Sequence, residues 1–142
     1  CTPLAEAATE PGEAGLIREA CFFGLGFGLA DIAQQELAVG LGVCASPGLA
    51  AAERRACSQG VAWGQTQNYW DREGAIAGWL RDQAPPGQLA DSASGVGIFV
   101  AMIGSDPGWI RRTCRELVPD GALSACLEGA RSNLRFMPTE TP

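Results

Sequence analysis

Small and hydrophobic residues recur along this chain with a period of about 35 residues. In each period a Cys or Ser is followed three residues later by a glycine and then by an apolar residue. With the Cys or Ser numbered as repeat position 0, these residues are Cys21, Cys57, Ser92 and Cys126, and the glycines at position +3 are Gly24, Gly60, Gly95 and Gly129. A period of this length is typical of one helix pair per repeat. We therefore expect an all-α fold, an array of about four helix-pair repeats that forms an α-solenoid or a compact helical bundle.

Proline residues divide the chain into expected helices. A proline precedes each repeat, and proline near a first turn is a helix-start signal; these prolines are Pro11, Pro47, Pro86 and Pro119. We predict four long helices, termed the A helices, at about 12–32, 48–68, 87–103 and 120–136. Shorter B helices are predicted over 35–44, 70–82 and 107–117. Residues 1–11 would then form an N-terminal tether, 12–136 the repeat domain and 137–142 a loose C-terminal tail.

The B segments carry signals of different strength. In the second, Ile76, Trp79 and Leu80 fall at helical spacing. The third begins with Asp106 and Pro107, a helix cap followed by proline at the first helical position. The first contains Gly40 and Gly42, which weaken its helical propensity.

The six cysteines follow the same repeat. Cys44 ends the first B segment and Cys57 lies 13 residues later; Cys114 and Cys126 have the same relation, 12 residues apart. In the second repeat Trp79-Leu80 and Ser92 stand in these two places, so both cysteines are absent together. This joint absence favours the disulfides Cys44–Cys57 and Cys114–Cys126. The remaining pair is then Cys1–Cys21, because Cys21 occupies the position that pairs backward along the chain.

Cys1 also supports a second interpretation. A mature lipoprotein begins with an acylated cysteine followed by a loose tether, and residues 2–12 could serve as that tether. This alternative leaves Cys21 without a partner. It would bring the chain to a membrane only through a lipid anchor at Cys1.

Composition and charge narrow the classes of function. The 142 residues include no Lys and no His and carry a net charge of −6. Without His the commonest general base and metal ligand is missing, and no CxxC spacing offers a zinc site. The acidic balance argues against a nucleic-acid partner. We expect no catalytic residues, no metal and no cofactor, and the cysteine content favours an oxidising, extracytoplasmic compartment: periplasm, cell surface or secreted.

Glycines inside the A helices need a physical reason, because each costs about 0.5–1 kcal/mol relative to alanine. Gly24 and Gly28 are four residues apart and share a helix face, as do Gly60 and Gly64. Such a face could hold a ligand or a partner helix closely, or it could pack each A helix on its neighbour. Recurrence in every repeat favours packing. We therefore interpret the residues at position +3 as helix-packing glycines, namely Gly24, Gly60, Gly95 and Gly129.

The stretch 63–73 is the richest in polar and aromatic residues. Tyr and Trp are favoured binding anchors, and amides can orient a small ligand. The candidate ligand- or partner-binding residues are Trp63, Gln67, Asn68, Tyr69 and Trp70. The alternative is a helix end with a polar loop and one packed Trp, and the sequence alone leaves both open.

Two segments of the A helices, GLGFGLA and GVGIFVA, resemble helices of a bacterial family encoded beside enediyne biosynthesis genes. The resemblance covers the A helices, and Gly129-Ala130-Arg131 departs from it. The period is also similar to that of tetratricopeptide arrays, although their Trp, Tyr and Pro positions are not matched. Both resemblances imply helical repeats, and neither supplies catalytic residues.

Repeats without a recurring catalytic group predict a non-enzymatic structural or protein-interaction module. The expected role is an accessory subunit of a larger extracytoplasmic assembly, with a protein as its partner. The alternative is a small-molecule binding or sequestering protein that uses residues 63–73.

Overall fold

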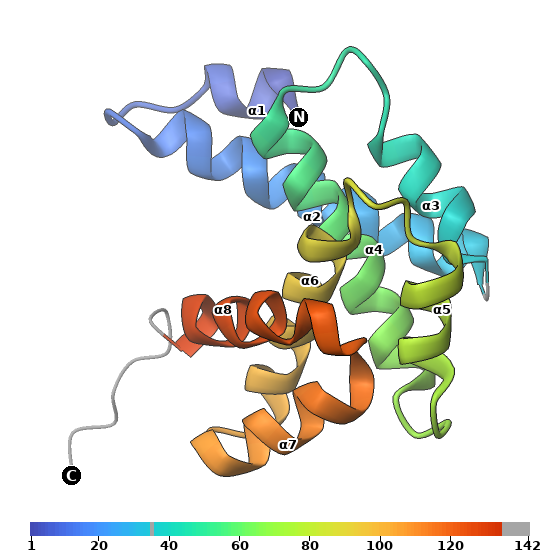
Figure 1. Ribbon diagram of the computed structural model, residues 1–142. Helices are drawn as coiled ribbons and strands as arrows, with labels where there is room; N and C mark the ends of the chain where they lie inside the picture. Colours follow the sequence, from blue (N-terminus) through green and yellow to red (C-terminus); the bar gives the residue numbers. More distant parts are fainter. Residues whose placement is uncertain (35, 135–142) are drawn as a thin grey trace, which may run out of the picture.

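A computed structural model describes residues 1–34 and 36–134, and within these ranges it contains helices and no strand. The helices are α1 (Thr2–Glu6), α2 (Glu13–Ala33), α3 (Leu37–Cys44), α4 (Ala51–Tyr69), α5 (Ala75–Gln83), α6 (Leu89–Ile103), α7 (Pro107–Leu117), the 3₁₀ helix η1 (Asp120–Ala122) and α8 (Leu123–Leu134) (Figure 1). The all-α prediction is confirmed, and the number of repeats stays a prediction. Gln35 and the predicted tail 137–142 lie outside the described residues.

The helices form two sets with different neighbours. The A helices α2, α4, α6 and α8 pack in chain order, each against the next. The B helices α3, α5 and α7 pack on the A helices and on one another in the same order. Figure 1 shows α3 and α5 together on one side of the molecule, with α2 and α8 extending to the other. The B helices therefore cover one side of the A helices and leave the other side open.

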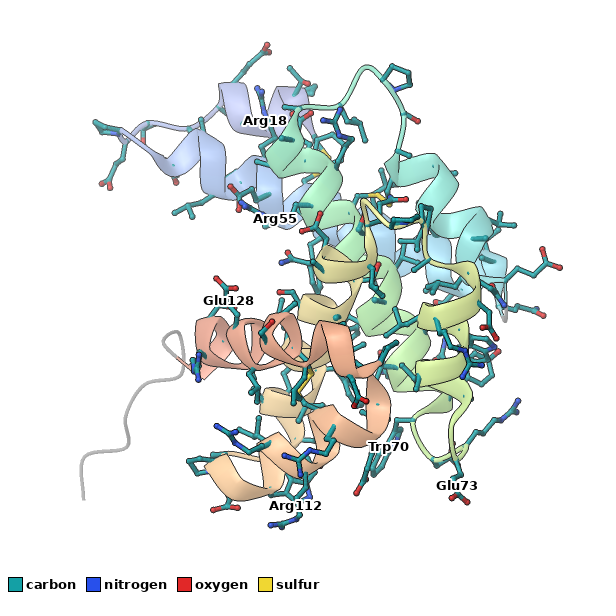
Figure 2. All side chains as sticks on the ribbon, in the orientation of Figure 1. Arg18, Arg55, Trp70, Glu73, Arg112 and Glu128 are labelled. Atoms are coloured by element: carbon teal, nitrogen blue, oxygen red, sulfur yellow. A yellow bond between two sulfur atoms is a disulfide. The ribbon has the colours of Figure 1, made fainter. Side chains whose placement is uncertain are left out.

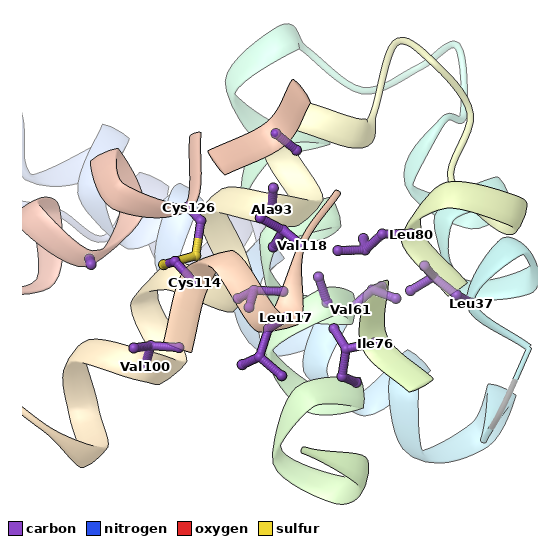
Figure 3. Close-up of a cluster of buried hydrophobic side chains, with 14 of the residues drawn as sticks. Leu37, Val61, Ile76, Leu80, Ala93, Val100, Cys114, Leu117, Val118 and Cys126 are labelled. Atoms are coloured by element: carbon purple, nitrogen blue, oxygen red, sulfur yellow. A yellow bond between two sulfur atoms is a disulfide. The ribbon is translucent and has the colours of Figure 1, made fainter. Parts of the chain in front are cut away.

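The core lies between these two sets (Figure 3). Leu37 and Leu80 of the B helices are 1% exposed, and Val61, Val96 and Val100 of the A helices are completely buried. Burying side chains of this size contributes about 1.5–3 kcal/mol each. This apolar layer orients each A helix, so that its opposite face is turned to solvent.

The boundaries of α5 differ from the predicted helix over 70–82. The helix begins at Ala75, and Gly74 just before it has a left-handed φ of 72°. Residues 70–74 form a turn after α4 instead. The prediction extended the helix too far toward the N-terminus because apolar spacing alone does not show where a left-handed glycine ends the turn.

The other two B helices form where they were expected. Asp106 caps α7, because its Oδ1 accepts a hydrogen bond of 2.6 Å from the Trp109 amide. In α3, Gly40 does not prevent the helix, and it gives Val61 room to approach. A Cβ at Gly40 would lie 2.9 Å from Val61 Cγ1. The glycine that weakens the local propensity therefore serves the packing of α3 on α4.

The structure contains three disulfides, and they are the three predicted ones: Cys1–Cys21, Cys44–Cys57 and Cys114–Cys126. Each joins a B helix, or α1, to the A helix that follows it. In the second repeat, Leu80 is 1% exposed and Ser92 is completely buried in the corresponding places. In the structure the Cys1 sulfur is bonded to that of Cys21.

These disulfides point to an oxidising, extracytoplasmic environment. Across residues 1–34 and 36–134, none of the helices combines the length and the apolar character that a bilayer crossing requires.

Glycines bring the backbones of consecutive A helices into contact. In the α2/α4 crossing, a Cβ at Gly26 would overlap the Cys57 carbonyl oxygen, and a Cβ at Gly60 would overlap the Phe23 carbonyl oxygen. The α6/α8 crossing repeats this arrangement, with Gly97 against the Cys126 carbonyl and Gly129 against the Ser94 carbonyl. Each glycine thus packs on the carbonyl three residues before the glycine of its partner helix.

The α4/α6 crossing has only half of this arrangement. Gly95 packs on the Gln59 carbonyl oxygen. The reciprocal position on α4 is Ala62, which is 2% exposed. Glycines at position +3 therefore face the preceding A helix, and small residues at position +5 face the following one.

The interpretation of Gly24 as a helix-packing glycine is wrong. Gly24 is exposed, and apart from its chain neighbours and the nearby backbone of α2, no described atom lies within 4 Å of the position that its Cβ would take. It is at position +3, and α2 has no A helix before it in the described structure. The glycine by which α2 packs on α4 is Gly26, at position +5.

Candidate functional site: a groove lined by the A helices

The predicted aromatic site is divided among different surroundings. Trp63 packs edge-on against Phe27 and Phe99, with ring centroids 5.1 and 5.9 Å away, and against Phe23 at 6.1 Å. Its indole Nε1 is buried and has no hydrogen-bond partner among the described atoms. Trp63 therefore joins α2, α4 and α6 as a packing residue.

Two further residues of this stretch lie against the B helices or the end of α2. Tyr69 contacts Trp79 of α5, with ring centroids 5.0 Å apart, and the Arg72 guanidinium lies 4.7 Å from the Tyr69 ring. Gln65 is 1% exposed, and its Nε2 donates to the Gln34 carbonyl oxygen at the end of α2. Both residues hold neighbouring helices together.

The remaining candidates lie at the surface. Gln67 and Asn68 are exposed, and Asn68 Nδ2 donates a 3.2 Å hydrogen bond to Asp31 Oδ1. Trp70 is 47% exposed, 6.4 Å from Phe99 between ring centroids (Figure 2). Since successive residues of a helix turn by 100°, a contiguous stretch of α4 points to several sides. The structure does not bring the five candidates into one pocket.

A groove of about 470 Å³ lies on the open side of the A helices. All four A helices contribute to its lining, which consists of Glu19, Arg55, Gln59, Ala90, Asp91, Ser94, Ile98, Ala125, Glu128 and Ser132. Figure 2 shows Arg55 on α4 and Glu128 on α8, on either side of the space between α2 and α8. The groove thus lies away from the B helices and is open to solvent.

A second hollow of about 430 Å³ continues this groove. It shares Glu19, Gln59, Ile98 and Ser132 with the first and adds the apolar residues Ala20, Phe23 and Ala56. The continuous surface, called the A-helix groove below, therefore has a polar part beside Arg55 and Glu128 and an apolar part beside Phe23.

Carboxylates outnumber cations in the polar part of the A-helix groove. Glu19, Asp91 and Glu128 line it, with Arg55 as the one basic residue of its lining. Gln59 Nε2 donates a 3.1 Å hydrogen bond to Ser94 Oγ and so connects α4 to α6 within the groove. Among the residues that the structure describes, no group of three metal-ligating side chains is close enough to hold an ion. This excess of carboxylates suits contact with a positively charged group.

Asp91 has a perturbed protonation equilibrium. Burial raises the pKa of its carboxyl, and the nearby Arg55 guanidinium opposes that rise. Because the folded state holds the proton more tightly than the unfolded chain, this carboxyl favours folding most at acid pH. That contribution is lost as pH rises through the raised pKa.

We expect an NMR titration of the Asp91 side-chain carbon to give a pKa above the ordinary value of about 3.9. Arg55→Gln should raise the pKa further, since it removes the opposing charge. Arg112→Gln, on α7 outside the groove, should leave it unchanged. A pKa at or below the ordinary value would contradict this description of Asp91.

The groove was missed in the sequence analysis, although the repeat frame contains its signal. Six of its ten lining residues stand two positions before repeat position 0, as Glu19 and Arg55 do, or two positions after it, as Gln59, Ser94 and Glu128 do. Each of these two positions is polar in three of the four repeats. A comparison of the residues at equivalent positions of the four repeats would have indicated that these polar residues share one face.

Comparisons with protein-family models, with curated proteins and with solved structures found no match to this chain.

Proposed function

We propose that the protein is a non-enzymatic interaction module, an accessory subunit of a larger extracytoplasmic assembly that binds a protein partner in the A-helix groove. The observation that carries this proposal is the groove itself, which every A helix helps to line. Helical arrays commonly present such extended surfaces to partners. The periplasm, the cell surface and the extracellular medium are the compartments in which three disulfides would persist.

The lining of the groove supports a particular kind of partner segment. Glu19, Asp91 and Glu128 attract basic side chains, and Phe23 and Ile98 offer apolar contact nearby. A segment with one or more Arg or Lys residues beside a small apolar side chain matches both parts. Because charges dominate the polar part, the affinity should fall as ionic strength rises.

The test is partner capture followed by a measured affinity. Immobilised protein with its disulfides intact would be exposed to the extracytoplasmic fraction of the native source, and retained proteins would be identified by mass spectrometry. The affinity of the purified partner would then be measured by calorimetry. We expect Glu128→Arg to weaken binding by about tenfold, or about 1.4 kcal/mol, because it places a cation among the groove's carboxylates.

Glu116→Arg is the matched control. Glu116 is an exposed residue of α7 outside the groove lining, and its substitution changes the net charge by the same amount. Equal weakening by both variants would show a general charge effect and contradict a groove site. Turnover of a substrate that is abolished by replacing one carboxylate would contradict the non-enzymatic role.

The alternative of a small-molecule site at residues 63–73 has less support. Trp63, Gln65 and Tyr69 are engaged in helix packing, which leaves exposed Trp70 as the main anchor. A ligand there should change the tryptophan fluorescence, and Trp70→Ala should remove that change while the fold is retained.

A further inference from the structure

A hollow of about 270 Å³ lies between α7 and α8, apart from the A-helix groove. The two helices pack side by side and are joined by the disulfide Cys114–Cys126 (Figure 1). The hollow, called the α7/α8 hollow below, is lined by Pro107, Ile110, Arg111, Leu127, Ala130 and Arg131. None of these residues lines the A-helix groove, so the two surfaces are separate.

The lining of the α7/α8 hollow combines buried apolar residues with exposed cations. Ile110 is 5% exposed and Ala130 1% exposed, and Leu127 is partly buried against the core. Arg111 of α7 and Arg131 of α8 are exposed. The lining contains no carboxylate. The hollow therefore has an apolar interior and two positive charges at its solvent-exposed edge.

Arg111 and Arg131 lack the partners that other arginines of this acidic chain have. Arg18 and Arg81 form ion pairs with carboxylates, at N–O distances of 3.6 and 2.7 Å, and Arg54 Nη1 donates a 2.7 Å hydrogen bond to a backbone carbonyl. Neither Arg111 nor Arg131 forms an ion pair with any residue that the structure describes. Their guanidinium groups are therefore available to an anion from outside the chain.

The carboxylates nearest in sequence face other places. Asp106 caps α7 through the Trp109 amide. Glu128, one turn before Arg131, lines the A-helix groove and shares with Arg131 a hollow beside it. Neither carboxylate lines the α7/α8 hollow, where two like charges repel each other. A bound anion would offset that repulsion.

The lining selects among anions. The planar guanidinium group matches a carboxylate, to which it can donate two parallel hydrogen bonds. The apolar interior favours a ligand with an apolar group and disfavours inorganic phosphate, which has none to place there. The volume of the hollow lies just below the range of about 300–1,000 Å³ that is common for ligand pockets, so the ligand should be small.

We propose that the α7/α8 hollow binds a small organic acid. Its carboxylate accepts hydrogen bonds from Arg111 and Arg131, and its short apolar group packs against Ile110, Leu127 and Ala130. This site is independent of the A-helix groove, because the two surfaces have no lining residue in common.

The test is an NMR titration of methyl-labelled protein, with its disulfides intact, using hexanoate as the probe. The methyl signals of Ile110 and Leu127 should shift and reach saturation. Two matched probes separate the contributions: 1-hexanol has the apolar group without the charge, and inorganic phosphate has the charge without the apolar group. Each should bind at least about tenfold more weakly than hexanoate. Shifts that do not saturate with hexanoate, or equal affinity for 1-hexanol, would overturn the proposal.

Arg111→Gln and Arg131→Gln should each weaken hexanoate binding by about tenfold. Both side chains are exposed, so the variants should keep the circular dichroism spectrum of the wild type. Arg115→Gln is the matched control, because Arg115 is an exposed residue of α7 outside the lining and its replacement removes the same charge. This variant should bind hexanoate as the wild type does. Equal weakening by all three variants would show a general charge effect and overturn the site.

Discussion

Replacing Cys114 and Cys126 together by Ala is expected to lower the free energy of unfolding by about 3 kcal/mol. The bond closes a loop with a sequence separation of 12 residues, and its loss gives the unfolded chain more conformational freedom. Both cysteines are completely buried, so the missing sulfurs also leave unfilled space in the core. Chemical denaturation followed by circular dichroism would measure the difference.

The Cys1 and Cys21 pair provides the contrasting variant. Loop entropy alone would give this bond a slightly larger effect, because its sequence separation is 20 residues. However, it holds only the five-residue helix α1, whose buried residue is Ala5. Without the bond, α1 can detach while α2–α8 stay folded, so the global loss should be smaller. A loss as large as that of the Cys114 and Cys126 variant would show that α1 supports the whole fold.

Gly97→Ala is expected to destabilise the protein by about 1–3 kcal/mol, although alanine is the better helix former. A Cβ at this position would overlap the Cys126 carbonyl oxygen. Backbone stands on both sides of the contact, so no flexible side chain can yield, and α6 and α8 must move apart. Thermal and chemical unfolding would both show the loss.

Gly15→Ala should have the opposite sign. Gly15 lies in the exposed first part of α2, with open space around the site of its Cβ. Alanine should therefore stabilise the protein by about 0.5–1 kcal/mol through helix propensity. If Gly97→Ala and Gly15→Ala changed stability in the same direction, close packing would not be the reason for glycine at position 97.

The disulfides could be predicted from the sequence because they depend on the repeat. Each bond joins the same two places in successive repeats, and both cysteines of the second repeat are absent together. The spacing of the cysteines along the chain was therefore enough to predict which of them form disulfides. The helices were predictable because proline residues and the spacing of apolar residues influence helix formation locally.

Gly24 shows what spacing could not reveal. The sequence places it in the same repeat position as Gly60, but a packing contact also needs a neighbouring helix. Position +3 faces the preceding A helix, and the described residues contain no A helix before α2. The same limit applies to α5, whose start depends on the backbone conformation of Gly74.

The candidate site was less predictable than the fold. Residues 63–73 are contiguous in sequence, and a helix distributes contiguous residues to several sides. The A-helix groove combines residues from four helices, such as Glu19 and Glu128, which are brought together by the crossings of α2 to α8. A search for local motifs finds sites made of contiguous residues, whereas a helical array forms sites from residues of several helices.

The absence of a disulfide from the second repeat has a mechanical consequence. Cys1–Cys21 and Cys44–Cys57 lie within α1–α4, and Cys114–Cys126 lies within α7–α8, so none of the bonds described ties the first half to the second. At the seam, Gly95 makes its backbone contact without a reciprocal glycine. Apart from the peptide chain itself, the two halves are therefore joined at α4 and α6 by noncovalent contacts alone, among them the Gln59–Ser94 hydrogen bond. The A-helix groove is lined from both halves, so a partner segment bound in it would add a noncovalent link across the junction that no disulfide crosses.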